Sequence, residues 1–337
     1  MENILTKLCA CTTVSGNELE NFQLIKKLLP ENTLLESDNN GNIVATLGNS
    51  NSDNIILLDA HNDQIGFIVT YIDEKGFIKV SNCGGIDRRV LLGSVVTVKG
   101  KYDIKGIICC LPPHLSDGGE DKAPSADSVY IDTGLSKEDV TALVSLGDRV
   151  VINATPKKLL GTRFTGVGLD NKAGVATIIK VAHLLSNEEL NCCVKLLFSC
   201  QEETGFLGSK TASFSISPKC AIVVDVSFAT QPSVPSEKCG VMSKGPMIGI
   251  APILNKDIFA NLKNIAENNN IPYQIEVMNS TTGTNADAIT ISKGGVPTGL
   301  VSIPLRNMHT QAEVVDMQDI DNSAQLIATF IKERGAL

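Results

Sequence analysis

Residues 54–60 form a run that is rich in aliphatic side chains on both of its faces. A strand that is apolar on both faces must be covered by other elements on both sides. Similar strand-sized runs recur at 193–199, 221–226 and 298–304, with helical patterns between them. Strands that alternate with helices form a mostly parallel sheet with helices on both faces. The chain is therefore predicted to contain an α/β domain.

Between residues 66 and 154 this alternation of strands and helices is interrupted. Helical periodicity is found there only around 137–146, and the short β-like runs are 67–72, 77–81, 94–99, 104–109, 129–131 and 149–152. Many short strands at close spacing predict a small barrel or sandwich. The α/β pattern resumes after Thr162, so we expect one discontinuous domain, 1–65 and 162–337, with a β-rich insert at 66–161. A length of 337 residues agrees with two domains at roughly 150 residues each.

The charge and aromatic content argue against a nucleic-acid partner. The formal net charge is −8, and the sequence pI is about 5.1. Contacts to phosphates need clustered Lys and Arg, which an acidic chain lacks. The aromatic content is 4% with no Trp, which leaves few platforms on which bases could stack.

The sequence predicts neither export nor contact with a membrane. The first residues lack the basic and long apolar regions of a signal peptide, and the longest apolar runs fall short of the ~20 residues that span a bilayer. The ten cysteines include neighbours at 9/11, 109/110 and 192/193, which rarely bridge one another. No Cys-x-x-Cys pair is present for a structural zinc site. We expect a reducing, cytoplasmic compartment.

Polar residues that could carry chemistry follow the predicted strands. In open α/β sheets, ligands bind outside the carboxyl ends of the strands. Two of the four histidines and several carboxylates occupy such positions, and one further Asp precedes the helix predicted at 171–185. These residues are His61, Asp63, Asp170, Glu202, Glu203, Asp225 and His309.

Each of these residues alone has a simpler interpretation. His61 and Asp63 are typical of a hydrogen-bonded surface pair, and Asp170 is typical of a helix N-cap. The adjacent glutamates could be solvated charge in a loop. Asp225 is harder to explain in this way, because it interrupts an aliphatic run in which an uncompensated carboxylate is costly.

Together the residues match a site for two divalent ions. Such a site needs about four protein ligands beyond a bridging carboxylate, and a base that is not itself a ligand. His61 and Asp225 can hold one ion, and Glu203 and His309 the other. Asp170 can bridge the two ions.

The remaining two residues can serve the reaction without holding an ion. Of the adjacent glutamates, one can point at metal and the other, Glu202, at the nucleophilic water. Asp63 can hydrogen-bond the second nitrogen of the His61 imidazole and so fix its tautomer.

Five ordered motifs contain these residues, and a sixth lies in the insert. The motifs are Asp-Ala-His-Asn-Asp-Gln-Ile-Gly-Phe at 59–67, Gly-Leu-Asp-Asn-Lys-Ala-Gly at 168–174, Gln-Glu-Glu-Thr-Gly at 201–205, Val-Val-Asp-Val at 223–226, Ile-Pro-Leu-Arg-Asn-Met-His-Thr at 303–310 and Gly-Gly-Ile-Asp-Arg-Arg-Val at 84–90. In these motifs the chain resembles the glutamyl-aminopeptidase and TET-aminopeptidase family of dinuclear metallopeptidases, which includes relatives described as cellulases. The resemblance extends from the turn at 12–17 to the last predicted helix.

The resemblance implies a fold, a ligand set and an assembly. The fold is a mostly parallel-sheet α/β metallopeptidase domain, phosphorylase/hydrolase-like, with an inserted small β-barrel-like domain used for dimerisation. Dimers of many members assemble into tetrahedral dodecamers. Carried onto this chain, the metal ligands are His61, Asp170, Glu203, Asp225 and His309, the general base is Glu202, and the residue that orients the imidazole is Asp63.

Four substitutions depart from the family pattern, and residues 226–228 lack a His that members often have two or three residues after the Asp. Gln64 stands where Glu is common, and Asn285 stands where Asp is usual. Asn307 replaces a frequent Tyr before the last ligand, and Gln311 replaces a frequent Pro after it. None of the four is an assigned ligand, so they concern the shape and charge of the substrate pocket.

We therefore expect a metal-dependent aminopeptidase that removes N-terminal residues from peptides and uses two divalent ions per subunit, zinc, cobalt or manganese. A water bridging the metals would give its proton to Glu202 and attack the first peptide carbonyl as hydroxide. Glu202 would then pass the proton to the leaving amine. Binding of the free α-amine restricts cleavage to the first residue.

Three alternatives remain open at this point. A related dinuclear metallo-amidohydrolase, a deacylase or a carboxypeptidase, would share the ligand set. A glycosidase would need two carboxylates at roughly 5 to 9.5 Å and no metal. An inactive oligomeric scaffold would have lost catalysis, although the ligand set is intact.

Overall fold

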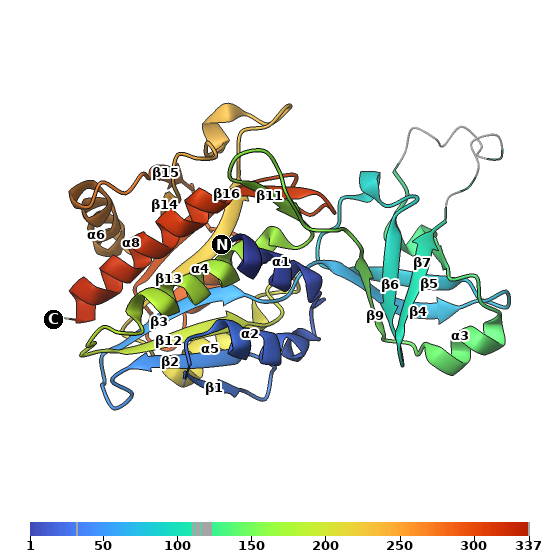
Figure 1. Cartoon of the computed structure of the whole chain (residues 1–337), viewed down its shortest axis with the longest axis horizontal. Coiled ribbons are helices and arrows are strands. Elements are labelled where there is room, and N and C mark those ends of the chain that lie inside the picture. Colours follow the sequence, from blue (N-terminus) through green and yellow to red (C-terminus); the bar gives the residue numbers. More distant parts are fainter. Residues whose placement is uncertain (32, 110, 112–114, 116–122, 336–337) are drawn as a thin grey trace.

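The structure is a computed structural model that describes residues 1–31, 33–109, 111, 115 and 123–335. It consists of an α/β part built on an 11-stranded sheet and a closed barrel, which lie side by side in Figure 1. The main sheet has the strand order β1-β2-β12-β3-β13-β16-β17-β11-β10, with β14 and β15 attached beside β16. The predicted combination of an α/β domain with a barrel-like insert is confirmed.

The middle of the main sheet is parallel. It consists of β12 (Cys193–Ser199), β3 (Ile55–His61), β13 (Cys220–Phe228) and β16 (Thr298–Arg306). In this register Ser199 lies beside His61, and Asp225 lies beside Ser302. The carboxyl ends of these strands therefore meet at one edge of the sheet, where the polar residues singled out in the sequence begin.

The outer strands make the sheet mixed rather than mostly parallel. They are β1 (Leu34–Ser37), β2 (Ile43–Gly48), β10 (Lys157–Lys158), β11 (Arg163–Gly166) and β17 (Glu313–Asp316), and they pair antiparallel with their neighbours. Beside β16, β14 (Met247–Ile250) pairs antiparallel with β16 and parallel with β15 (Gln274–Val277). Short connections such as those of β1–β2 and β16–β17 allow antiparallel neighbours only, whereas parallel neighbours need a long crossover.

Helices cover both faces of the main sheet. Alternate residues of β3 define the two faces, since Leu58 belongs to one apolar cluster and Leu57 to another. The Leu58 face is covered by α1 (Glu2–Ala10), α2 (Phe22–Leu28), α4 (Leu169–Leu185), α6 (Lys256–Asn268) and α8 (Met317–Gly335). The Leu57 face is covered by α5 (Leu207–Ile216) and α7 (Asn285–Thr290).

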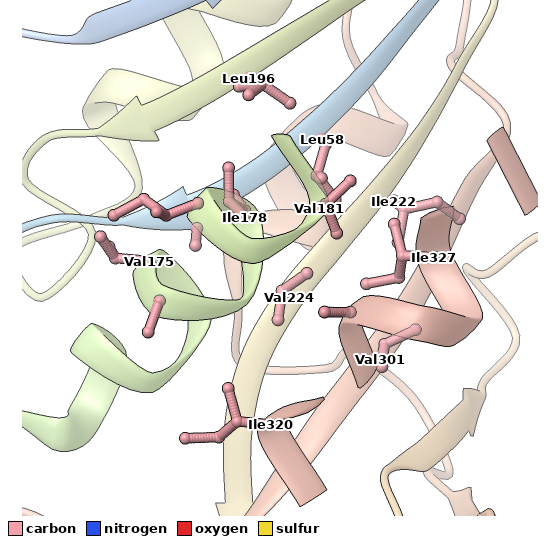
Figure 2. Close-up of a cluster of buried hydrophobic side chains, with 14 of the residues drawn as sticks. Leu58, Val175, Ile178, Val181, Leu196, Ile222, Val224, Val301, Ile320 and Ile327 are labelled. Atoms are coloured by element: carbon pink, nitrogen blue, oxygen red, sulfur yellow. The ribbon is translucent and has the colours of Figure 1, made fainter. Parts of the chain in front are cut away.

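Helix α4 is buried on most sides, as its sequence predicts. Figure 2 shows Val175, Ile178 and Val181 of α4 among side chains of the sheet and of α8, including Val224 and Ile320. Because α4 packs against the sheet, α1 and α8, it has little polar surface. The first turn of this helix, which carries Asp170, is thereby held firmly over the end of the sheet.

The insert has a core of its own. Its six strands are β4 (Gly66–Ile72), β5 (Ile78–Cys83), β6 (Val95–Lys99), β7 (Asp103–Ile108), β8 (Tyr130–Asp132) and β9 (Arg149–Ile152), closed in the order β4-β5-β8-β7-β6-β9. Helix α3 (Lys137–Leu143) packs beside them. Phe67, Val98 and Val150 belong to the barrel core. Strand β10, inside the range 66–161 expected for the insert, pairs with β11 in the main sheet.

Several helices and strands of the structure were not predicted from the sequence. They are α5, the outer strands β1, β10, β11 and β17, and the short 3-10 helices at Glu18–Asn21, Arg88–Val90, Ala126–Ser128 and Ser236–Lys238. The face that α5 buries is formed by Gly208, Ser209, Ala212 and Ser213, so it shows no aliphatic periodicity.

Two expectations from composition can be compared with the structure. Cys9, Cys192, Cys193, Cys200 and Cys220 are buried thiols outside any disulfide, so they pack as small apolar residues. Within the part of the chain that the structure describes, no helix is both long and apolar enough to cross a bilayer.

Candidate metal centre

The residues singled out in the sequence come together at the carboxyl edge of the parallel strands. His61 ends β3, Asp225 lies in β13, and Asp170 lies in the first turn of α4. The adjacent glutamates follow β12, and the second histidine follows β16. A cavity of about 450 Å³ is lined by His61, Asp170, Glu202, Glu203, Asp225 and His309, together with residues of the 282–284 loop.

Asp170 lies at the middle of this cluster. Its Oδ1 is 3.1 Å from Nε2 of His61, and its Oδ2 is 3.3 Å from Nε2 of His309. Asp225 Oδ1 lies 3.8 Å from the same nitrogen of His61, and Glu203 Oε1 lies 3.7 Å from that of His309. The two oxygens of Asp170 thus face two separate groups of donor atoms.

The simpler interpretation of Asp170 as a helix N-cap is wrong. The N-cap position of α4 is Gly168, and the backbone of Asp170 and Asn171 is not helical. Asn171 holds this irregular turn, because its Nδ2 donates to the carbonyl of Val224 at 2.8 Å and its Oδ1 accepts from the N–H of Gly174 at 2.9 Å. The turn directs the Asp170 carboxylate toward both histidines rather than toward its own helix.

Three sets of donor atoms in the cluster have a spacing suited to a metal ion. They are His61, Asp170 and Asp225; His61, Glu202 and Glu203; and Asp170, Glu203 and His309. Within each set the donor atoms lie within 4.8 Å of one another. Two of the sets share Asp170, so one carboxylate could serve two ions.

The carboxylates of the cluster are buried close to one another. Burial, reinforced by the neighbouring carboxylates, raises the pKa of Glu202 and of Glu203 to about 8. Burial also raises the pKa of Asp225 well above its usual value. Their ion pairs within the described residues are all with the two histidines. Buried negative charge of this kind calls for cations, and divalent ions fit the oxygen and nitrogen donors present.

The same carboxylates raise the pKa values of the two histidines. Although burial favours the neutral ring, the carboxylates around it, led by Glu202, raise the pKa of His61 well above its usual value. Burial likewise opposes protonation of His309, but the bond to Asp170 raises its pKa to about 9. Burial disfavours ionised Asp170, yet the hydrogen bonds from His309 and His61 hold its pKa below its usual range.

Asp63 contacts His61 differently from the expected arrangement. The His61 Nδ1 is 3.0 Å from the backbone carbonyl oxygen of Asp63 and 3.5 Å from its carboxylate. The carboxylate instead accepts the N–H groups of Glu202 at 3.0 Å and Glu203 at 3.2 Å, and the hydroxyl of Ser15 at 2.6 Å. The side chain of Asp63 therefore fixes the backbone of the loop that carries the two glutamates.

Glu313 belongs to the site and was missed in the sequence. It is buried at the start of β17 and accepts the N–H of His309 at 2.9 Å and that of Asp170 at 3.2 Å. Burial, followed by the charge of Asp170, raises the pKa of this carboxyl to about 8. The sequence did contain an indication of this role. Glu313 belongs to the β-like run Glu-Val-Val four residues after His309, just as Asp225 belongs to an aliphatic run.

The four departures from the family pattern fall in two places. Gln64 and Asn285 are buried beside the site, where Gln64 accepts from Lys172 and Asn285 donates to Asp59 at 2.9 Å. Asn307 and Gln311 line a second cavity of about 590 Å³. This cavity adjoins the first, since Phe228 and Met308 line both.

Comparison with known proteins identifies the class to which this fold and site belong. The sequence profile of the M42 glutamyl aminopeptidase family matches residues 41–326. The chain belongs to this family, as the motifs predicted, and is thereby placed among the peptide hydrolases of aminopeptidase type.

Individual relatives agree over nearly the whole chain. The lysyl aminopeptidase of Pyrococcus furiosus is 31% identical over 304 residues, which cover 88% of this chain and 86% of that protein. An aminopeptidase from the archaeon Desulfurococcus kamchatkensis has a similar structure, with a TM-score of 0.91, 32% identity, and coverage of 98% of this chain and 94% of the other.

Two further solved structures bear on assembly and on the glycosidase alternative. The Pyrococcus horikoshii TET1 peptidase, described as able to assemble into a tetrahedron or a large octahedral shell, has a TM-score of 0.87, 29% identity, and coverage of 98% and 99% of the two chains. A Thermotoga maritima protein described as an endoglucanase has a TM-score of 0.79, 28% identity, and coverage of 98% and 97%.

We expect Glu313→Ala to weaken binding of divalent cations by about 10- to 100-fold, because it leaves the N–H groups of Asp170 and His309 without their acceptor. Glu313→Gln should show a smaller loss, since one oxygen remains. The measurement is metal content after dialysis against graded metal concentrations. Glu276→Ala is the control, because Glu276 accepts from the hydroxyls of Ser227 and Ser302. Equal metal affinity in Glu313→Ala and wild type would contradict the role of Glu313.

Proposed function

We propose that this protein is a metal-dependent aminopeptidase that removes N-terminal residues from peptides. The observation that carries the proposal is the position of Asp170, whose two carboxylate oxygens face the imidazoles of His61 and His309. Each imidazole has a second carboxylate close by, Asp225 or Glu203. This is the donor arrangement that a pair of divalent ions with one bridging carboxylate requires.

In this proposal the five ligands divide into two half-sites. The first half-site consists of His61 and Asp225, and the second of Glu203 and His309, with Asp170 shared. Mixed nitrogen and oxygen donors suit zinc, cobalt or manganese, and availability decides among them. The presence of two imidazoles favours a metal site over a glycosidase site, which needs a pair of carboxylates.

The bound ions would polarise the scissile carbonyl and make a water molecule acidic. Glu202 is the general base: its carboxylate takes a proton from the attacking water, whose oxygen bonds to the carbonyl carbon. Glu202 then gives that proton to the nitrogen of the leaving amine as the carbon–nitrogen bond breaks. Asp63 supports this role, because it holds the N–H groups of both Glu202 and Glu203.

Glu202→Gln and Glu203→Gln are the same change at adjacent positions, and the proposal assigns them different results. Glu202→Gln should keep its metal and lose a factor of about 10² to 10⁴ in turnover, because the base is removed. Glu203→Gln should lose metal from one half-site. The measurements are metal content per chain and hydrolysis of aminoacyl anilides by the metal-loaded variants. Full turnover in Glu202→Gln would refute the assignment of the base.

A substrate panel distinguishes this function from the related amidohydrolases. We expect hydrolysis of peptides with a free α-amine, none of their N-acetylated forms, and loss of activity on chelation with recovery on adding zinc, cobalt or manganese. Product analysis by mass spectrometry identifies the bond that is cut. Cleavage of the acetylated peptides, or release of C-terminal residues, would support the deacylase or carboxypeptidase instead. Peptide hydrolysis that resists chelators would refute metal dependence, and no peptide hydrolysis together with chelator-resistant cleavage of a glycoside would support a glycosidase.

We propose further that the protein forms a homo-oligomer in the cytoplasm, with a dimer made through the insert. Leu92, Val95 and Ile107 expose 46%, 47% and 51% of their surface on the barrel, and Val95 lies opposite Ile107 in the β6–β7 pair. A second copy that covers this apolar surface would remove it from water. The assembly described for the Pyrococcus horikoshii relative and the buried free thiols support these two proposals.

Val95→Lys should shift the protein to a smaller species, because burying an ammonium at an apolar interface carries a large desolvation cost. Val277→Lys is the matched control, since Val277 is a more exposed valine on strand β15 of the α/β part. The measurement is the molar mass by light scattering on a size-exclusion column. An unchanged mass in Val95→Lys would exclude this surface as the dimer interface.

A further inference from the structure

A loop of the barrel touches the candidate metal centre. After β5 the chain runs through residues 84–87 toward the short helix Arg88–Val90, and its two glycines meet ligand side chains. A Cβ added to Gly84 would lie 2.9 Å from Oε2 of Glu203, and one added to Gly85 would lie 3.2 Å from Nδ1 of His309. Both contacts are with the half-site formed by Glu203 and His309.

The same loop is fixed at both of its sides. On the side of the site, the N–H of Asp87 donates to the carbonyl oxygen of His309 at 3.2 Å. On the other side, the buried side chains of Ile86 and Ile65 belong to the barrel core. The backbone at Gly85 is therefore held against the His309 imidazole by the barrel itself.

The two histidines of the cluster are oriented by different means. Nδ1 of His61 is bonded to the backbone oxygen of Asp63 at 3.0 Å. In the described part of the chain no such bond reaches Nδ1 of His309, and the backbone of Gly85 packs there instead. A metal-bound imidazole usually owes its orientation to a hydrogen bond from its second nitrogen. At His309, packing against a glycine takes that place.

We infer that Gly84 and Gly85 are positioning residues, through which the barrel sets the geometry of the Glu203–His309 half-site. The inference rests on the proposed metal-dependent function. A Cβ at Gly85 would lie closer to His309 than ordinary van der Waals contact allows, so the ring has to give way by a few tenths of an ångström. Metal–ligand distances tolerate about 0.2 Å, so a displacement of that size weakens one half-site and leaves the His61–Asp225 half-site intact.

Gly85 is the better position to test. Gly84 has φ +81°, so any substitution there strains the backbone as well, whereas the backbone of Gly85 is outside the left-handed region. The variants are Gly85→Ala and the larger Gly85→Val. Gly294→Ala is the matched control, because Gly294 is also outside that region and no atom lies within 4 Å of its added Cβ.

The experiment is a titration of each metal-free variant with Co²⁺, followed by calorimetry and by absorbance, with metal content per chain as a second readout. We expect Gly85→Ala to weaken one of two ions by about 10- to 100-fold and leave the other unchanged, with excess metal restoring full occupancy. Gly85→Val should lose more, and Gly294→Ala should match wild type. Adding Gly85→Ala to His309→Ala should cause no further loss, because the glycine acts through His309.

The outcomes separate this inference from the function on which it rests. A wild-type protein that binds no divalent ion would refute the metal-dependent function itself. Two ions of wild-type affinity in Gly85→Ala and in a folded Gly85→Val would overturn only the role of Gly85. An equal loss at both half-sites, or a further loss in the His309→Ala background, would also overturn it, because the effect would then not pass through His309.

Discussion

The contact of one buried carboxylate with two imidazoles organises the rest of this structure. Asp170 reaches His61 at the end of β3 and His309 beyond β16, and these two strands are separated by β13. This strand order brings both histidines to one helix start, with Asp225 between them on the middle strand. Burial of α4 against the sheet then determines how closely Asp170 approaches.

Around this contact the protein gathers negative charge beyond the five ligand candidates. Asp63 accepts the N–H groups of Glu202 and Glu203, and Glu313 accepts those of Asp170 and His309. A neutral acceptor could also satisfy these N–H groups. Because carboxylates are present instead, the site contains additional negative charge that bound cations can balance. A chain built in this way is stabilised when divalent ions bind, because the repulsion among its buried carboxylates is then offset.

The sequence predicts those features of the fold and the site that depend on residues close together in the chain. The aliphatic runs identify β3, β12, β13 and β16, and the strand ends identify the residues that follow them, since both depend on a few neighbouring positions. Partners across the fold could not be predicted. Glu313 and the carboxylate of Asp63 accept hydrogen bonds from backbone groups that lie far away in the sequence or across a turn. Helix α5 buries small residues that show no aliphatic periodicity.

The place of insertion explains why a barrel loop can reach the candidate metal centre. Strand β3 ends at His61 and the barrel begins at Gly66, while on the return β9 ends at Ile152 and β10 begins at Lys157, paired with Thr165 of β11. Both connections between the two parts are therefore short, and the first leaves the main sheet directly after His61. The connection after β3 thus places the barrel so that its 84–87 loop lies against Glu203 and His309.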